Sequence, residues 1–428
     1  MTKQLISHKK TLIWILILFN ITVTFGMSFA YWASVILGND DDVSGSVTIG
    51  EWGIPITTPQ EFYDFATKSS STADDLYYLY TDLDFTGFDW NYDASNNAVI
   101  FRGTLNGNGK TISNLTINNF SSSYLYHGIF PRMDGGTVSN LTLENVNLEL
   151  NATSLGGTSI QAGLIAGYVY NGKVNTMSSI TIIDCGVKGT SLGGSGGLIG
   201  RIGTNGTEVI ISNIKATNLR VFSKTANVGG LVGRINNNAT VNLTDIDIQG
   251  EVYAHNAAGN TGGVIGFITN NNQPVSIKNA VVEMGSQNTL ETDSTYHLLY
   301  TKRYLGGIIG YHNRTGSLTT IENVIFMGSL YNNLNNRRLD IGTVTGRATA
   351  ANTPTITQTY YSFVAFRSST GAVVYSPDGT PTGQMSTVVV EDDYPGNAWW
   401  NSAHAILSAE NDAWKQDSVT GRPYLDFT

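Results

Sequence analysis

The sequence predicts an all-β protein, and three features of its 428 residues lead to this prediction. Glycine is abundant and proline is scarce, with 47 Gly against 9 Pro, and only 13% of the residues are charged. Short runs of Val, Ile and Leu alternate with polar residues, as they do in β-strands. Turns rich in Asn, Thr, Ser and Gly separate these runs, so many short strands are expected rather than helices or disorder.

Charge and cysteine content narrow the class further. The formal net charge of −9 provides no basic surface of the kind that binds nucleic acid, so no nucleic-acid partner is predicted. Cys185 is the only cysteine, which excludes an intrachain disulfide. It ends a strand-like run, and we expect it to be a buried, unreactive side chain.

The N-terminus has the pattern of an export signal. A basic start precedes an apolar run from Leu12 to Phe25, and Ser28 and Ala30 supply the small residues of a cleavage site. We therefore predict a signal peptide over residues 1–30, a linker over 31–53, and a location outside the cell or at its surface.

An uncleaved membrane anchor is the alternative, because the stretch from Thr11 to Leu37 is long enough to span a bilayer. In either case membrane contact is expected only through this segment. Ala30–Ser34, followed by Gly45–Trp52, resembles the alternative signal peptides of some Gram-positive matrix and surface proteins.

A short glycine-marked motif recurs seven times and predicts a solenoid. Copies such as Gly197-Leu198-Ile199-Gly200 are separated by 36, 33, 33, 33, 44 and 36 residues when counted from their closing residues. Each copy is followed by a second alternating run, so one unit per turn is expected, with equivalent strands pairing in parallel about 4.8 Å apart. The closing residues are Pro131, Gly167, Gly200, Gly233, Gly266, Gly310 and Gly346.

Period-2 alternation assigns the faces of these strands. One set of apolar residues should point into the coil, and the closing glycines share that parity, where a side chain would not fit or the strand kinks. The inward set is Ile129, Ile165, Leu198, Leu231, Val264, Ile308, Met133, Val169, Ile202, Ile235 and Ile268. Five apolar residues of opposite parity find no place in this scheme: Phe130, Ile199, Val232, Ile265 and Ile309.

These copies resemble the GLUG repeat of bacterial surface proteins. Phe101–Leu115 resembles the coil that precedes such repeats, and Thr58, Pro59 and Glu61 resemble the start of the helix that caps the open end. The resemblance runs from about Ile54 to the C-terminus. It implies a single-stranded, right-handed parallel β-helix of the pectin-lyase-like kind with an N-terminal capping helix.

The resemblance also implies a domain order. The cap and first coils would occupy 54–127, the repeats 128–366, and a C-terminal coil and cap 367–428. Trp414 and Gly421–Leu425 resemble the segment that closes such repeat bodies, where aromatic residues would cover exposed core. The longest unit predicts a loop over Ser286–Tyr304 that projects from one coil.

No complete active site is predicted, so the chain is expected not to be an enzyme. The acidic clusters Asp82/Asp84, Asp245/Asp247 and 391–393 are expected in turns or on solvated surface, and none recurs on the next coil. The histidines lack metal-ligand spacing, so neither a metal nor a cofactor is expected.

One surface feature stands out. The residue after each closing residue should point outward, and these residues should form a column that binds planar or polyhydroxylated ligands. Neighbouring Arg and aromatic side chains also stabilise one another, which is a purely structural explanation of the same pattern. The column comprises Arg132, Tyr168, Arg201, Arg234, Phe267, Tyr311 and Arg347.

Two functions follow. A non-catalytic exported surface or matrix protein, with surface glycans or other surface proteins as partners, explains the export signal and the repeats. A carbohydrate-active β-helix enzyme, either a lyase or a hydrolase, is the alternative, and its support is an analogy of fold alone.

Overall fold

The chain divides into two units, Met1–Trp52 and Gly53–Thr428, and all residues described below belong to the second. The predicted signal peptide, anchor and linker up to residue 52 lie outside them. Within the described residues, no helix is long and apolar enough to cross a membrane. The computed structural model describes residues 53–67, 70–91, 99–118, 125–150, 160–189, 192–203, 206–223, 227–236, 238–254, 259–269, 272–284, 299–301, 304–313, 318–332, 341–342, 344–348, 354–367, 373–375, 388–391, 404–405, 407–409, 411–419 and 422–426.

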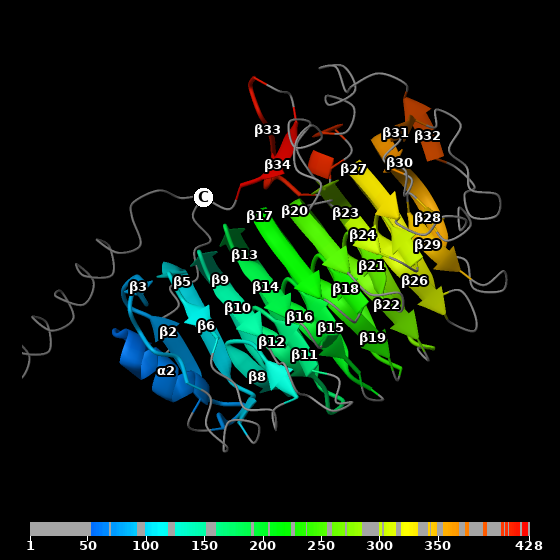
Figure 1. Cartoon of the computed structure of the whole chain (residues 1–428). Helices are drawn as coiled ribbons and strands as arrows, with labels where there is room; N and C mark the ends of the chain where they lie inside the picture. Colours follow the sequence, from blue (N-terminus) through cyan, green and yellow to red (C-terminus); the bar gives the residue numbers. More distant parts are fainter. Residues whose placement is uncertain are drawn as a thin grey trace, which may run out of the picture. The chain divides into compact units, whose positions relative to one another are not determined.

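Three sheets of mainly parallel strands and one two-stranded sheet are described in the second unit, and the longest sheet has 17 described strands (Figure 1). Its strands are β1 (Ile54–Ile56), β2 (Leu76–Leu79), β3 (Leu83–Asp84), β5 (Thr104–Ser113), β6 (Thr116–Ile117), β9 (Thr137–Glu144), β10 (Asn147–Leu150), β13 (Val174–Ile183), β14 (Gly186–Gly189), β17 (Glu208–Ser223), β20 (Thr240–Ala254), β23 (Val275–Met284), β24 (Leu299–Thr301), β27 (Thr319–Asn332), β30 (Thr355–Arg367), β31 (Val373–Tyr375) and β32 (Val388–Glu391). We refer to it as the long sheet.

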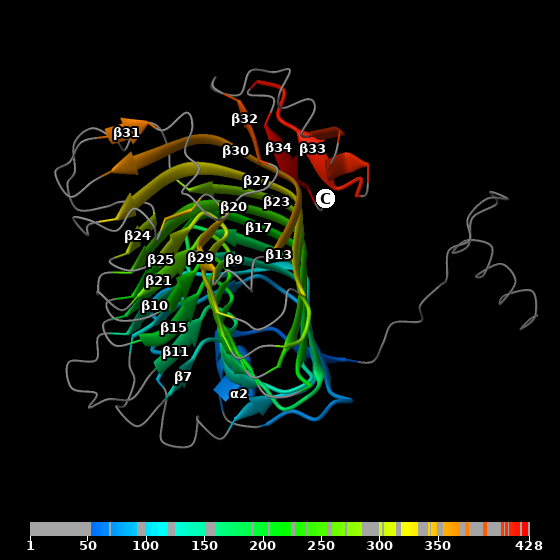
Figure 2. The same ribbon diagram turned by 90° about the vertical axis from the view of Figure 1, so that its right-hand side faces the viewer.

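The two smaller sheets each take one strand from successive repeats. The eight-stranded sheet contains β4 (Ile100–Phe101), β8 (Phe130–Met133), β12 (Ala166–Val169), β16 (Ile199–Ile202), β19 (Val232–Asn236), β22 (Ile265–Thr269), β26 (Ile309–Asn313) and β29 (Thr345–Ala348). The seven-stranded sheet contains β7 (Tyr126–His127), β11 (Ile160–Gly163), β15 (Leu192–Gly196), β18 (Asn227–Gly229), β21 (Asn260–Gly262), β25 (Tyr304–Gly306) and β28 (Ile341–Gly342). Figure 2 shows the seven-stranded sheet across the interior from the long strands β13 and β23.

Each strand pairs in parallel with the equivalent strand of the next repeat. For example, β13 pairs with β17, β16 with β19, and β15 with β18. In the described residues the antiparallel pairs are β30–β31 and the small C-terminal sheet of β33 (Trp414–Gln416) and β34 (Pro423–Leu425). The predicted all-β class with parallel pairing is confirmed.

A column of left-handed residues bends the long strands. Asn213 and Asn279 both have φ of 54°, and the pairing of β13 with β17 passes from Ser178↔Ser212 directly to Ile180↔Ile214. Asn adopts this conformation more readily than most residues, and its amide can bond to the next coil. Asn279 Nδ2 donates to Asp245 Oδ1 at 3.2 Å, and Asn323 Nδ2 donates to Asn279 Oδ1 at 3.0 Å. The bend is thus stabilised from coil to coil.

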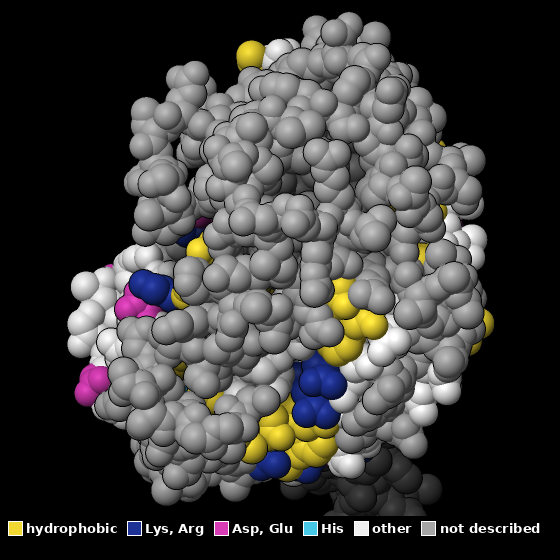
Figure 3. Space-filling view, turned by 45° about the vertical axis from the view of Figure 1, so that its right-hand side comes forward, with side chains coloured by type: hydrophobic (Ala, Val, Ile, Leu, Met, Phe, Trp, Pro, Cys, Tyr) yellow, Lys and Arg dark blue, Asp and Glu magenta, His cyan; other side chains and the backbone are white. Residues whose placement is uncertain are grey.

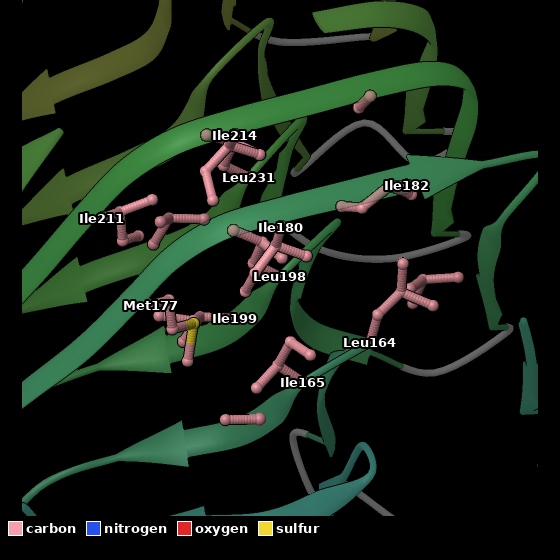
Figure 4. Close-up of a cluster of buried hydrophobic side chains, with 14 of the residues drawn as sticks. Leu164, Ile165, Met177, Ile180, Ile182, Leu198, Ile199, Ile211, Ile214 and Leu231 are labelled. Carbon is pink, nitrogen blue, oxygen red and sulfur yellow. The ribbon is translucent and has the colours of Figure 1, made fainter. Parts of the chain in front are cut away.

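A tight corner between the two smaller sheets explains where the five residues that the alternation scheme left unassigned lie: it turns them into the core. Between β15 and β16 the chain bends at residues 197–198, so Leu198 and Ile199 are both completely buried. Figure 4 shows both among the core side chains, near Ile180 and Met177 of β13. Strict alternation fails here because the bend turns two consecutive side chains inward.

The closing glycines lie where two backbones touch. A Cβ atom built on Gly200 would lie 2.4 Å from the backbone nitrogen of Ala162, and one on Gly233 would lie 2.5 Å from that of Ser195. Both contacted strands belong to the seven-stranded sheet of the preceding coil. The prediction that no side chain fits at these positions is therefore confirmed.

The N-terminal helix α2 (Pro59–Thr67) begins as its sequence predicts. Glu61 Oε2 accepts hydrogen bonds from the backbone nitrogens of Thr57 at 2.7 Å and Thr58 at 3.2 Å, and the Glu61 nitrogen donates to Thr58 Oγ1 at 3.2 Å. These bonds satisfy donors that a helix start leaves free, and those from Thr57 lower the pKa of Glu61. Phe62 is fully buried against Phe85.

The C-terminal segment lies in a different place from the predicted one. Its described residues do not close an end of the coil stack. Instead, Trp414 Nε1 donates to Asp245 Oδ1 at 2.9 Å, and Asn411 Nδ2 donates to Asn213 Oδ1 at 3.1 Å. Figure 1 shows β33 and β34 beside β17 and β20. Val281, Ile325, Leu407, Trp414 and Leu425 form a separate apolar cluster there.

Two salt bridges fix this segment. Arg422 Nη2 lies 2.7 Å from Asp247 Oδ1, and Arg422 Nε lies 2.7 Å from Glu283 Oε2. Burial acts to lower the pKa of Arg422, but the two carboxylates together raise it. Asp245 and Asp247 are 7% and 3% exposed, so their prediction as solvated surface was wrong. The cause is the docked segment, which covers this outward face.

We predict that Gly200→Val and Gly233→Val strongly lower the melting temperature, because the new side chains meet backbone atoms that cannot move aside. Overpacking of this kind costs about 1–3 kcal/mol or more. Gly186→Val is the matched control, since its Cβ would meet the end of the Asn147 side chain at 3.0 Å. Arg201→Ala is the second control. Equal melting temperatures for all four variants would contradict the proposed contact.

A second prediction concerns the salt bridges. Arg422→Gln leaves Asp247 and Glu283 without their shared cation, and breaking such a buried pair costs about 3–5 kcal/mol. We expect the segment over 404–426 to become sensitive to limited proteolysis while the coils remain resistant. Arg220→Gln, which removes an exposed pair with a separation of 3.9 Å, should change nothing. Equal resistance of the two variants would show that the pairs do not hold the segment.

Candidate ligand-binding column

The structure brings the seven predicted column residues into one row of the eight-stranded sheet. Their Cα atoms pair coil by coil in the order Arg132↔Tyr168↔Arg201↔Arg234↔Phe267↔Tyr311↔Arg347. The side chain of Arg347 lies outside the described residues. The other six therefore define the column described below.

The aromatic rings of the column stack on one another. Tyr168 stacks with both Tyr126 and Tyr170, with centroid distances of 4.9 Å and 5.2 Å. Phe267 and Tyr311 stack at 5.1 Å with an interplanar angle of 9°. Since neighbouring coils are themselves about 4.8 Å apart, these rings lie parallel to the coil layers and direct their edges outward. Their faces are occupied, so the predicted stacking of a planar ligand is not supported by this geometry.

The arginines lie over the same rings. Arg201 Cζ is 5.1 Å from the centroid of Tyr168, and Arg234 Cζ is 5.4 Å from that of Phe267. Such contacts contribute about 0.5–1 kcal/mol each at partly exposed sites. They hold each half-buried guanidinium group against an aromatic ring.

The column is less exposed than its outward parity predicts. Tyr168 is only 9% exposed, its hydroxyl donates to the Gly203 carbonyl, and burial raises its pKa. The other five described members are half-buried. Rings from the seven-stranded sheet cover part of the column: Tyr126 on Tyr168, and Tyr304 at 4.4 Å from Tyr311.

A second row of side chains, from the seven-stranded sheet, lies beside the column. A Cβ on Gly194 would be 3.5 Å from Arg234 Cβ, which places the two rows in contact. Asn260 Nδ2 donates to Asn227 Oδ1 at 2.6 Å along this row. Sequence analysis missed it, although each member lies six residues before a closing glycine. The row comprises Gln161, Gly194, Asn227, Asn260 and Tyr304.

Arg201 and Arg234 are adjacent cations without an acidic partner among the described residues. Burial, and then the charge of Arg201, lower the pKa of Arg234. Two like charges about 5 Å apart repel by about 3 kcal/mol at an effective dielectric constant of about 20. Arg201 Nε donates to Asn236 Oδ1 at 3.0 Å, whereas Arg234 Nε is buried with no acceptor in the described part of the chain. The pair is thus a centre of uncompensated positive charge.

The Arg132 end of the column differs. There Asp134 Oδ2 lies 2.9 Å from Arg102 Nε, and both this carboxylate and Arg132 lie near the Tyr170 ring. Figure 3 shows Lys and Arg side chains between two hydrophobic groups on one face of the molecule. Along the column, Arg201 and Arg234 lie between Tyr168 and Phe267.

The remaining groups singled out in the sequence have structural roles or lie outside the described residues. Cys185 is buried, and desolvation raises its pKa to about 12, so it is a thiol at neutral pH. Asp84 Oδ1 accepts hydrogen bonds from Asn114 and Thr86, which lower its pKa. Among the described residues, no three His, Cys, Asp or Glu side chains are placed to hold a metal ion. Most of the predicted loop (285–298) and residues 392–393 lie outside the residues that the structure describes.

Comparisons with known proteins show the fold. No protein-family model and no curated protein matches the sequence. A solved structure from Bacteroides ovatus, provisionally named an immunoglobulin A1 protease, is similar over 88% of this chain and 93% of that chain, with a TM-score of 0.56 and 16% identity. Another, named IgA1 Protease, has a TM-score of 0.39 and 14% identity over 85% of this chain and 28% of that chain.

Proposed function

We propose that this chain is an exported, non-catalytic surface or matrix protein that binds extended glycans along the column. In this proposal the body is a right-handed parallel β-helix built from GLUG-like repeats, and the N-terminal segment directs export. The recurrent motif, the parallel register and the solved structure of similar fold support the architecture. The basic and apolar N-terminal pattern supports export.

The observation that carries the binding function is the Arg201–Arg234 pair. Its guanidinium groups are oriented by aromatic rings and are not neutralised by any described residue. Because the column adds one side chain per coil, an extended chain could contact several coils at once. Weak contacts then combine, as they do in adhesion.

A catalytic function is the second candidate, because the solved structure of similar fold bears a protease name. At 16% identity that likeness concerns the fold alone. A carbohydrate-active enzyme, the alternative that the sequence left open, would need at least two ionisable groups close together on adjacent coils. Proteolysis and polysaccharide cleavage can both be tested on the same preparation of the protein.

We expect the purified full chain to retain a subset of glycans on an array, and Arg201→Ala/Arg234→Ala to lose that binding. Incubation with the retained glycans should release no reducing sugar, and incubation with IgA1 should leave its heavy chain intact. Absence of binding to any glycan would refute the binding function. Sugar release or heavy-chain cleavage that disappears in an Asp→Asn or Glu→Gln variant would establish the enzyme instead.

A further inference from the structure

We propose that the column selects negatively charged polysaccharides, and that Arg201 and Arg234 together hold one carboxylate or sulfate group of the chain. This inference rests on the proposed glycan binding and names its ligand class. The site is built from two neighbouring rows: the column on β16 and β19, and the row on β15 and β18 that includes Gly194 and Asn227.

The first argument is charge. The protein as a whole is acidic, with a net charge of −9, yet these two neighbouring guanidinium groups have no carboxylate partner in the described residues. Burial, and then the neighbouring charge of Arg201, disfavour the charged form of Arg234 and lower its pKa. An anion at their outer edge removes this repulsion. At the Arg132 end, the carboxylate of Asp134 is paired with Arg102.

The second argument is the geometry of recognition. Neutral sugars are commonly bound through the face of an aromatic ring, but the rings of Tyr168 and Phe267 have their faces against neighbouring side chains. Arg201 and Arg234 are half-buried, so their guanidinium groups, rather than ring faces, are the groups that the column offers to a ligand. A planar guanidinium binds a carboxylate or sulfate through two parallel hydrogen bonds, and such charge-assisted bonds are the strong ones.

The third argument is the position of the pair within the column. Phe267 and Tyr311 follow Arg234 in the column, and Tyr168 precedes Arg201. The surrounding acidic protein repels a polyanion elsewhere, so binding should concentrate on the pair. This predicts a modest dependence on salt, corresponding to about two neutralised charges rather than to a long basic track.

The ligand series tests the class. Polygalacturonate and its methyl ester share a backbone and differ in charge, and heparin and dextran provide a sulfated and a neutral polymer. A DNA oligonucleotide serves as a polyanion without sugar carboxylates or sulfates. In titrations of the full chain at low salt, we expect polygalacturonate or heparin to bind at least about tenfold more tightly than the ester, dextran and DNA.

The variants test the residues. Arg201→Gln/Arg234→Gln should reduce binding of the charged polymer by about tenfold or more, whereas Arg201→Lys/Arg234→Lys should retain part of it, because charge remains but the planar fork is lost. Lys188→Gln/Arg220→Gln is the matched control, since it removes two exposed charges from the long sheet. Equal melting temperatures would show that all these variants are folded.

The outcomes separate the two proposals. Equal binding of charged and neutral polymers, equal binding of DNA, or unchanged binding by the Gln variant would overturn the anion selectivity and leave glycan binding intact. Failure of every polymer and every arrayed glycan to bind would remove the proposed function itself. Tight binding of the charged polymer that the Gln variant loses and the control retains supports the inference.

Discussion

Contact between two backbones at the glycine corner is the constraint on which this architecture depends. Gly200 and Gly233 press against strands β11 and β15 so closely that a methyl group has no room. The same corner turns Leu198 and Ile199 into the core together. The first copy departs from the rule with Pro131, and its position explains why. Among the described residues, no strand of the seven-stranded sheet precedes β7, so Pro131 meets no such backbone.

The column is a product of that corner. The pairing of β12 with β16 omits the closing glycine and resumes at Tyr168↔Arg201, so the next residue of every copy falls into the same row. Stacking between coils then fixes the rings and the guanidinium groups above them. The close packing at each closing glycine therefore places the next residue of every repeat in one surface row. It does not determine which type of residue occupies that row.

Sequence patterns predicted what is local or periodic. The spacing of closing residues placed all seven column members in register, and the Thr58–Glu61 pattern predicted the start of the helix, because both depend on residues close in the chain. The burial of Asp247 and the site of the C-terminal segment were not predicted. The partners Asp247 and Arg422 are 175 residues apart, and alternation along β20 says only that Asp247 points outward, not that Arg422 covers it.

The row that contains Gln161, Asn227 and Asn260 could be predicted only in part. Its members recur at a fixed distance from the closing glycines, so the sequence contains the signal. Its proximity to the column depends on the angle of the corner, which no alternation pattern gives. The Gly194–Arg234 contact joins strands from different sheets and different coils, and only the folded chain brings them together.

The docked C-terminal segment has a consequence for the order of assembly. Its partners Asn213, Asp245, Asp247 and Glu283 come from three successive coils and form one surface only after those coils have stacked. The residues of this segment can therefore attach only after these three coils have stacked. Once attached, they shield Val281 and Ile325, so a chain that ended early would leave an apolar patch open to association with other molecules. The docked segment thus covers an apolar patch that exists only once the coils beneath it have stacked.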